Sequence, residues 1–76
     1  TRFRPKPDPA GFRRLFRRHG IPPRRCVMVE DSPENLVTAK RLGMRTVLVG
    51  PATRRPLGVD HVIADLARLP RLLRRL

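Results

Sequence analysis

The 76 residues are enough for one small domain, which buries only about 60% of the surface that its unfolded chain exposes. The hydrophobic fraction of 39% excludes a compositionally disordered chain, and no apolar run approaches the roughly 18 residues of a membrane span. The single cysteine, Cys26, excludes an intrachain disulfide. We therefore expect a cytoplasmic protein with no membrane partner.

The charge balance is strongly basic. Lys+Arg number 18 against 6 Asp+Glu, a net charge of +12, and the only lysines are Lys6 and Lys40. Such a charge attracts nucleic acids or acidic membranes. The basic residues are spread along the whole chain, however, and neither Trp nor Tyr is present to stack on bases. We interpret the charge as a solvated surface and keep a basic nucleic-acid-binding module as the alternative.

The first expected element is a helix that follows a loop over residues 1–7. Asp8 and Pro9 are typical of the N-cap and first position of a helix, and Gly20 is typical of its end. The apolar residues of this helix recur at helical spacing, as Phe12, Leu15 and Phe16.

A buried strand and a second helix are expected next. The run Cys26–Val29 is apolar throughout, which predicts a strand that is buried on both faces of a parallel sheet. Ser32 and Pro33 then predict the N-cap and first residue of a helix that ends at Leu42.

The rest of the chain predicts two more strands, with a loop between them, and a last helix. These elements are Arg45–Val49, Gly50–Gly58, Asp60–Ala64 and Leu66–Leu76. Asp65 would cap the last helix, and Pro70 would kink or delay it. This order predicts an α/β fold, the C-terminal part of a doubly wound, mainly parallel Rossmann-like sheet. Three strands alone would leave both edges of the sheet open.

A candidate site follows the first strand. Glu30 and Asp31 stand at its carboxyl end, where open α/β sheets place their chemistry. Adjacent carboxylates repel each other unless a cation compensates them, and Mg²⁺ is the usual cation. A right-handed crossover would bring Lys6, just before the first helix, to the same edge of the sheet. These residues predict a metal-assisted phosphate site; a solvated turn that only caps the helix is the alternative.

Several segments in this order resemble the C-terminal half of haloacid dehalogenase-like (HAD) hydrolases. They are Lys6-Pro7-Asp8-Pro9, V-M-V-E-D-S-P-E-N-L, A-K-R-L-G-M-R-T-V-L-V-G and D-H-V-I-A-D-L-A-R-L-P. Within that superfamily the chain is most similar to the pyrimidine 5′-nucleotidase-like branch. The resemblance implies hydrolysis of phosphate monoesters through an aspartyl-phosphate, with Mg²⁺ as cofactor. It also implies a phosphorylated small molecule as substrate, with a nucleoside 5′-monophosphate preferred.

The resemblance assigns a role to each matching residue. Lys6 would stabilise the nucleophile and the phosphoryl group. Asp31 would bind Mg²⁺ directly, and Glu30 would bind it directly or through a water. Asn35 would brace the acidic loop, and Ser32 would cap the helix that follows.

The 76 residues also depart from the family pattern. The family's nucleophile motif, Asp-x-Asp-x-Thr or Val, and its Ser or Thr both lie upstream of the lysine, and this sequence contains neither. Residues 1–76 are therefore predicted to be a C-terminal fragment of a HAD-like core domain, without the nucleophile strand and the cap domain. We expect this fragment to be inactive alone. The missing strand would leave the Cys26–Val29 edge open to self-association.

Two other interpretations stay open. A receiver-like fragment would also have paired acids, but it needs a phosphoacceptor Asp after a later strand, and Val49 is followed by Gly50-Pro51. A degenerate, non-catalytic remnant of the hydrolase would keep the fold and pair through its open edge.

Overall fold

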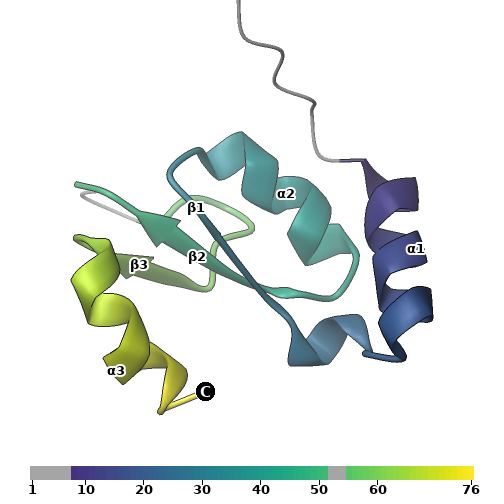
Figure 1. Cartoon of the computed structure of the whole chain (residues 1–76). Helices are drawn as coiled ribbons and strands as arrows, with labels where there is room; N and C mark the ends of the chain where they lie inside the picture. Colours follow the sequence, from purple (N-terminus) through teal and green to yellow (C-terminus); the bar gives the residue numbers. More distant parts are fainter. Residues whose placement is uncertain (1–7, 52–54) are drawn as a thin grey trace, which may run out of the picture.

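The computed structural model describes residues 8–51 and 55–76 (Figure 1). Within them, β1 (Val27–Glu30), β2 (Arg45–Val49) and β3 (His61–Ile63) form one parallel sheet in the order β1-β2-β3. Helix α2 (Pro33–Arg41) makes the crossover from β1 to β2. The predicted α/β fold with a parallel sheet is thus confirmed.

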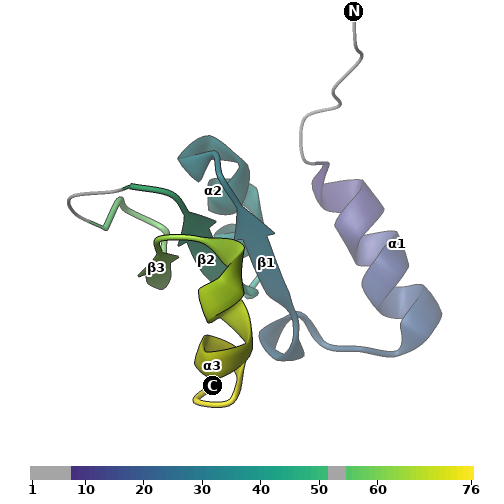
Figure 2. The same ribbon diagram turned by 60° about the vertical axis from the view of Figure 1, so that its left-hand side comes forward.

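The other helices surround this sheet (Figures 1 and 2). Helix α2 covers one face, and the short α3 (Leu69–Leu73) lies on the opposite side. Helix α1 (Pro9–His19) stands beyond the β1 edge and reaches β1 through the 3-10 turn η1 (Pro23–Arg25). None of the helices over residues 8–51 and 55–76 is long and apolar enough to cross a membrane.

The core lies between α2 and the sheet. Leu36, Leu48 and Val59 are buried together, and Met28 and Val62 pack against them. The strand register explains this grouping, because Leu48 is paired with Val62 and neighbours in register lie on the same face of a sheet. The apolar residues of α2 and of the middle strand, β2, thus exclude water from the space between the helix and the sheet.

One buried polar residue, Thr46, holds the start of β2 to the segment before β3. Its hydroxyl donates to the Gly58 carbonyl at 2.7 Å and accepts from the Asp60 amide at 3.0 Å. The Asp60 carboxylate in turn accepts from the Thr46 amide at 2.9 Å and from Lys40 Nζ at 2.7 Å. The burial of Thr46 therefore leaves no polar group of its side chain unpaired.

The predicted first helix is confirmed at both ends. Asp8 accepts a hydrogen bond from the Ala10 amide at 3.0 Å through its side chain, as an N-cap residue should. Gly20 closes the helix with a φ of 64°, in the left-handed region that favours glycine. The first strand begins one residue later than predicted, because the Cys26 amide bonds to the Pro23 carbonyl and belongs to the η1 turn.

The predicted last helix over Leu66–Leu76 is wrong as a single element. A 3-10 turn, η2 (Leu66–Arg68), comes first, and α3 follows with only five residues. Pro70 has no amide hydrogen, so it fits only in the first turn of a helix, which is where α3 places it. Asp65 caps η2 by accepting from the Ala67 amide, so the predicted start is confirmed.

Candidate active site at the carboxyl edge of the sheet

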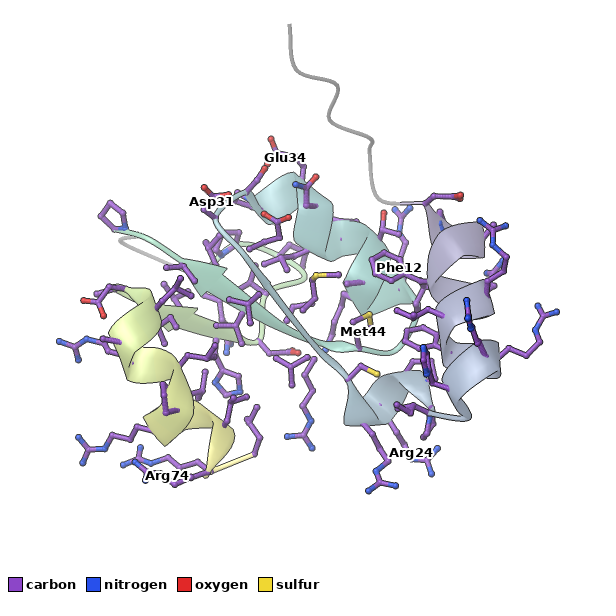
Figure 3. All side chains as sticks on the ribbon, viewed as in Figure 1. Phe12, Arg24, Asp31, Glu34, Met44 and Arg74 are labelled. Carbon is purple, nitrogen blue, oxygen red and sulfur yellow. The ribbon has the colours of Figure 1, made fainter. Side chains whose placement is uncertain are left out.

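The strands β1–β3 end at one edge of the sheet, called the carboxyl edge below. Strand β1 ends at Glu30, Asp31 and Ser32 form the turn, and α2 begins at Pro33. Asp31 and Glu34 lie together at this edge in Figure 3. Glu30 and Met28 share the α2 face of the strand, since side chains alternate along it. The fold thus brings Glu30 under the first turn of α2.

The Glu30 carboxylate is held by hydrogen bonds from its own turn. Its Oε1 accepts from Asn35 Nδ2 at 3.3 Å, and its Oε2 accepts from the Asp31 amide at 3.2 Å. These donors offset part of the negative charge that two adjacent acids bring together. From the sequence, a cation was expected to provide all of this compensation, whereas the structure supplies two N–H groups for one of the acids.

The Asp31 side chain has a different environment. It is exposed, and its carboxylate makes no hydrogen bond within residues 8–51 and 55–76. It lines a cavity of about 370 Å³ with Pro33 and with residues at the end of β2 and in the loop that follows. The other lining residues are Leu48, Val49, Gly50, Pro51 and Pro56. Of the two acids, Asp31 is therefore the one that is exposed to solvent beside a cavity.

Ser32 occupies the N-cap position of α2, but its side chain makes no capping hydrogen bond. The predicted position is right, and the predicted capping bond is not formed. At the first turn of α2, the pKa of Glu34 lies below its ordinary value of 4.5. Its own backbone amide has the largest effect, the Ser32 side chain adds to it, and burial opposes it slightly. A negative charge also suits this end of a helix.

The described acids form only part of a metal centre. Within residues 8–51 and 55–76, no group of three or more His, Cys, Asp or Glu side chains could hold an ion together. Mg²⁺ nevertheless often binds through one or two carboxylates and takes its other ligands from water and substrate phosphate. Hard oxygen donors at Asp31 and Glu30 fit that pattern. The Asp31 oxygens accept no hydrogen bond from residues 8–51 and 55–76, whereas both oxygens of Glu30 already accept one.

Two parts of the predicted site have different outcomes. Lys6 lies outside the described residues, so its expected position next to Glu30 and Asp31 stays a prediction. The loop after β2, where Gly50 and Pro51 line the cavity beside Asp31, was not predicted to belong to the site. A signal for it was present, because parallel neighbours end at the same edge and the residues after β2 must therefore lie near those after β1.

Comparison with known proteins gives the family. The sequence model described as HAD-hydrolase-like matches residues 3–69, nearly the whole chain. A parallel three-stranded sheet with an acidic turn after its first strand agrees with this match. The chain belongs to the HAD-like hydrolase family, whose members generally depend on Mg²⁺.

Solved structures support the same relation. A 2-haloacid dehalogenase from Pseudomonas syringae pv. Tomato is 34% identical, with 92% of this chain covered and a TM-score of 0.76. A haloacid dehalogenase-like protein of unknown function from Agrobacterium tumefaciens is 29% identical, with 92% covered and a TM-score of 0.73. CbbY from Rhodobacter sphaeroides, solved with phosphate, is 29% identical, with 91% covered and a TM-score of 0.67.

The chain spans about a third of these structures, 32%, 36% and 32% of their lengths. No curated protein matches the chain. None of the three structures is called a 5′-nucleotidase, so the nearer relation to that branch stays a prediction.

Proposed function

We propose that these residues form the C-terminal part of the catalytic core of a Mg²⁺-dependent phosphohydrolase that cleaves phosphate monoesters. The observation that carries the proposal is the unequal acid pair at the end of β1. Glu30 is fixed by Asn35 and by the Asp31 amide, while the Asp31 carboxylate accepts no hydrogen bond from the described part of the chain and lines the cavity. The phosphate bound to CbbY supports this reaction class.

Each residue then has a distinct task. Asp31 supplies oxygens to the cation, and Glu30 orients the turn and adds negative charge near it. Asn35 fixes the Glu30 carboxylate, and Ser32 keeps the turn next to the start of α2. When bound, Mg²⁺ would offset the charge of the phosphoryl group.

Lys6 and the nucleophile complete the proposed site. Lys6 would place a positive charge next to the nucleophilic carboxylate and the phosphoryl oxygens. The nucleophile, an aspartate that would form the aspartyl-phosphate, would come from a segment not contained in these 76 residues. We therefore expect the 76-residue chain to lack turnover of its own.

Hydrolytic dehalogenation of a 2-haloacid is a second candidate, favoured by the 34% identity to the Pseudomonas enzyme. The acid pair argues against it here, because a haloacid carries its own carboxylate and two neighbouring acids would repel that charge without a cation. Mg²⁺ is commonly bound by one or two carboxylates together with a substrate phosphate, so a phosphate monoester suits the acid pair better than a haloacid does. Of the phosphate monoesters, a nucleoside 5′-monophosphate is the preferred substrate.

Binding of a paramagnetic cation tests the metal role on the chain itself. In ¹⁵N-labelled protein, Mn²⁺ used in place of Mg²⁺ should broaden the amide signals of Asp31 and Ser32 before others. Asp31→Asn should abolish that local broadening. Asp65→Asn, which removes another exposed acid near the same edge, should preserve it. Equal broadening in wild type and Asp31→Asn would remove Asp31 from the proposed site.

Activity distinguishes the two reaction classes. In a longer form of the protein that carries an upstream nucleophile strand, phosphate release from p-nitrophenyl phosphate should require Mg²⁺, and Asp31→Asn should lower it at least about 100-fold. Halide release from 2-chloropropionate should stay at background. Halide release without phosphate release would favour the dehalogenase, and turnover by the 76-residue chain alone would contradict its expected inactivity.

A further inference from the structure

The acidic side chains are concentrated toward one end of the strands. Five of the six acids stand at the start of a helix or at the carboxyl end of a strand. They are Asp8, Glu30, Asp31, Glu34 and Asp65. The sixth, Asp60, is hydrogen-bonded to Lys40 and to the Thr46 amide. The edge at which the strands begin, called the amino edge below, therefore has no free acid among residues 8–51 and 55–76.

Basic residues gather at the amino edge. Helices α1 and α2 end where β1 and β2 begin, and their last turns contain Arg17, Arg18, Lys40 and Arg41. In Figure 3, Arg24 and Arg74 point away from this edge, on the side opposite Asp31 and Glu34. Helices and strands run in opposite directions, so basic residues that are spread along the sequence come together at the ends of the helices.

Three arginines from two segments line one hollow of this edge. Arg24 and Arg25 come from η1, and Arg45 is the first residue of β2. With Val27 and Leu76 they line a cavity of about 230 Å³. Favourable interaction with a helix C-terminus explains basic residues in the last turns of α1 and α2. It does not explain Arg45, which begins a strand.

These arginines have no carboxylate partner. The part of the chain that the structure describes contains one ion pair, Lys40 to Asp60, and all six acids lie within that part. Arg24, Arg25 and Arg45 are all exposed. Like charges held together without counter-charge repel each other, so an anion that bridges them would be bound favourably.

We propose that the amino edge, through Arg24, Arg25 and Arg45, binds the phosphate backbone of double-stranded DNA. Guanidinium groups match phosphate oxygens in paired, planar geometry, and a row of them suits a regular array of phosphates. The binding is independent of base sequence, because the guanidinium groups contact phosphates, which carry no sequence information. It lies at the opposite edge from the acid pair and does not use the proposed active site.

The side chains at this edge favour a duplex over other polyanions. Single strands are usually bound by stacked aromatics, but Phe12 and Phe16 stack on each other in α1, with ring centroids 6.3 Å apart. Duplex RNA is distinguished from DNA by its 2′-hydroxyls, and contacts between these arginines and backbone phosphates require no 2′-hydroxyl. Stable binding to an acidic membrane is favoured by an apolar helix face beside the charge, and α3, the helix that leads to Leu76 at this hollow, has only five residues.

A salt titration with matched variants tests the proposal. Fluorescence anisotropy would measure binding of the 76-residue chain to a labelled 20-base-pair DNA duplex of mixed sequence across a range of salt concentrations. The edge variant combines Arg24→Gln, Arg25→Gln and Arg45→Gln. The control variant combines Arg13→Gln, Arg14→Gln and Arg68→Gln, which removes three exposed arginines away from the hollow. Circular dichroism would establish that both are folded.

The two variants should differ, although their net charge is equal. The edge variant should lose affinity by roughly tenfold or more, and its log–log salt slope should become shallower by about 2.7, as three lost phosphate contacts require. The control should change the slope by less than about 1. Equal losses in both variants, or no binding of wild type at low salt, would overturn the proposal.

A conservative variant makes the geometry itself testable. Arg24→Lys, Arg25→Lys and Arg45→Lys keep every charge but remove the planar fork, so the salt slope should be kept while the affinity falls several-fold. This variant also serves if the glutamine variant fails to fold. Tighter binding to duplex RNA, or to phosphatidylserine vesicles, than to duplex DNA would contradict the assignment to DNA.

Discussion

Helices α1 and α2 begin and end with similar local signals but are packed very differently. Each starts with a proline after a polar N-cap residue, and a glycine with positive φ follows each, Gly20 after α1 and Gly43 after α2. Yet α2 buries Leu36 and Ala39 completely, whereas α1 buries none of its 11 residues.

The difference comes from what lies next to each helix. Helix α2 covers β1 and β2, while α1 stands beyond the β1 edge, where the described residues provide no further strand (Figure 2). The apolar side chains of α1 are left half-covered, and Leu15 is 51% exposed. Local signals thus determine where a helix starts and stops, and its neighbours determine how much stability it contributes.

Removal of the buried side chain of α2 should have the largest effect. Leu36→Ala deletes a fully buried leucine from the core cluster and should lower the free energy of unfolding by about 2–5 kcal/mol. A domain of this size rarely has more than about 3–5 kcal/mol in total, so the variant should be largely unfolded at 25 °C. Circular dichroism during urea unfolding would measure the change.

The same truncation in α1 is the matched control. Leu15→Ala removes the same atoms from an exposed site and should change the free energy of unfolding by less than about 0.5 kcal/mol. Similar losses for the two variants would mean that α1 is packed in solution as tightly as α2, which would end the contrast between the helices.

The next largest effect concerns the hydrogen bonds through which Asp60 links α2 to the sheet. Among the described residues, α1 has no such link. Asp60 accepts from Lys40 at the end of α2 and from the Thr46 amide in β2. Burial opposes ionisation of Asp60 most strongly, but these hydrogen bonds and the nearby positive charges together lower its pKa from 3.8. Because the folded pKa is lowered, the stabilisation is present above pH 3.8 and is lost as the pH falls through the folded value.

Asp60→Asn should therefore lower the free energy of unfolding by about 1 kcal/mol at neutral pH, a value reduced by the partial exposure of the pair. It should also flatten the fall of stability below pH 4. Thermal unfolding followed at pH 7 and across pH 2–5 would measure both effects. Asp31→Asn, which removes an exposed carboxylate without a described hydrogen bond, should change little at pH 7. If the stability of Asp60→Asn fell below pH 4 in the same way as that of wild type, the proposed link through the Asp60 carboxylate would be contradicted.

The fold follows from the sequence because its signals are local and mutually consistent. Asp8, Pro9 and Gly20 define α1, and the apolar run after Pro23 defines β1, whose position was predicted to within one residue. The last helix was predicted too long because its leucine spacing continues past Pro70. The sequence left open whether the proline kinks the helix or delays its start, and the structure shows the delay.

The candidate site follows from the sequence only in part. The place of Glu30 and Asp31 at a strand end could be predicted, because the chain order fixes it. Their unequal roles could not, since the bonds from Asn35 and from the Asp31 amide depend on side-chain geometry. The gathering of arginines at the amino edge was also not predicted, because it arises only when Arg45 and the η1 turn become neighbours in space.

The smallest expected effects separate the two helix starts. Asp8 makes a capping hydrogen bond, so Asp8→Ala should destabilise α1 by about 1 kcal/mol and speed exchange of its amides about fivefold. The global melting temperature should barely change, because α1 buries none of its residues. Ser32 makes no capping bond, so Ser32→Ala should leave exchange in α2 nearly unchanged while the pKa of Glu34 rises toward 4.5. Hydrogen exchange and carboxyl titration by NMR would measure both effects. If Ser32→Ala speeded exchange in α2 more than Asp8→Ala speeded it in α1, the capping roles assigned to the two residues would be wrong.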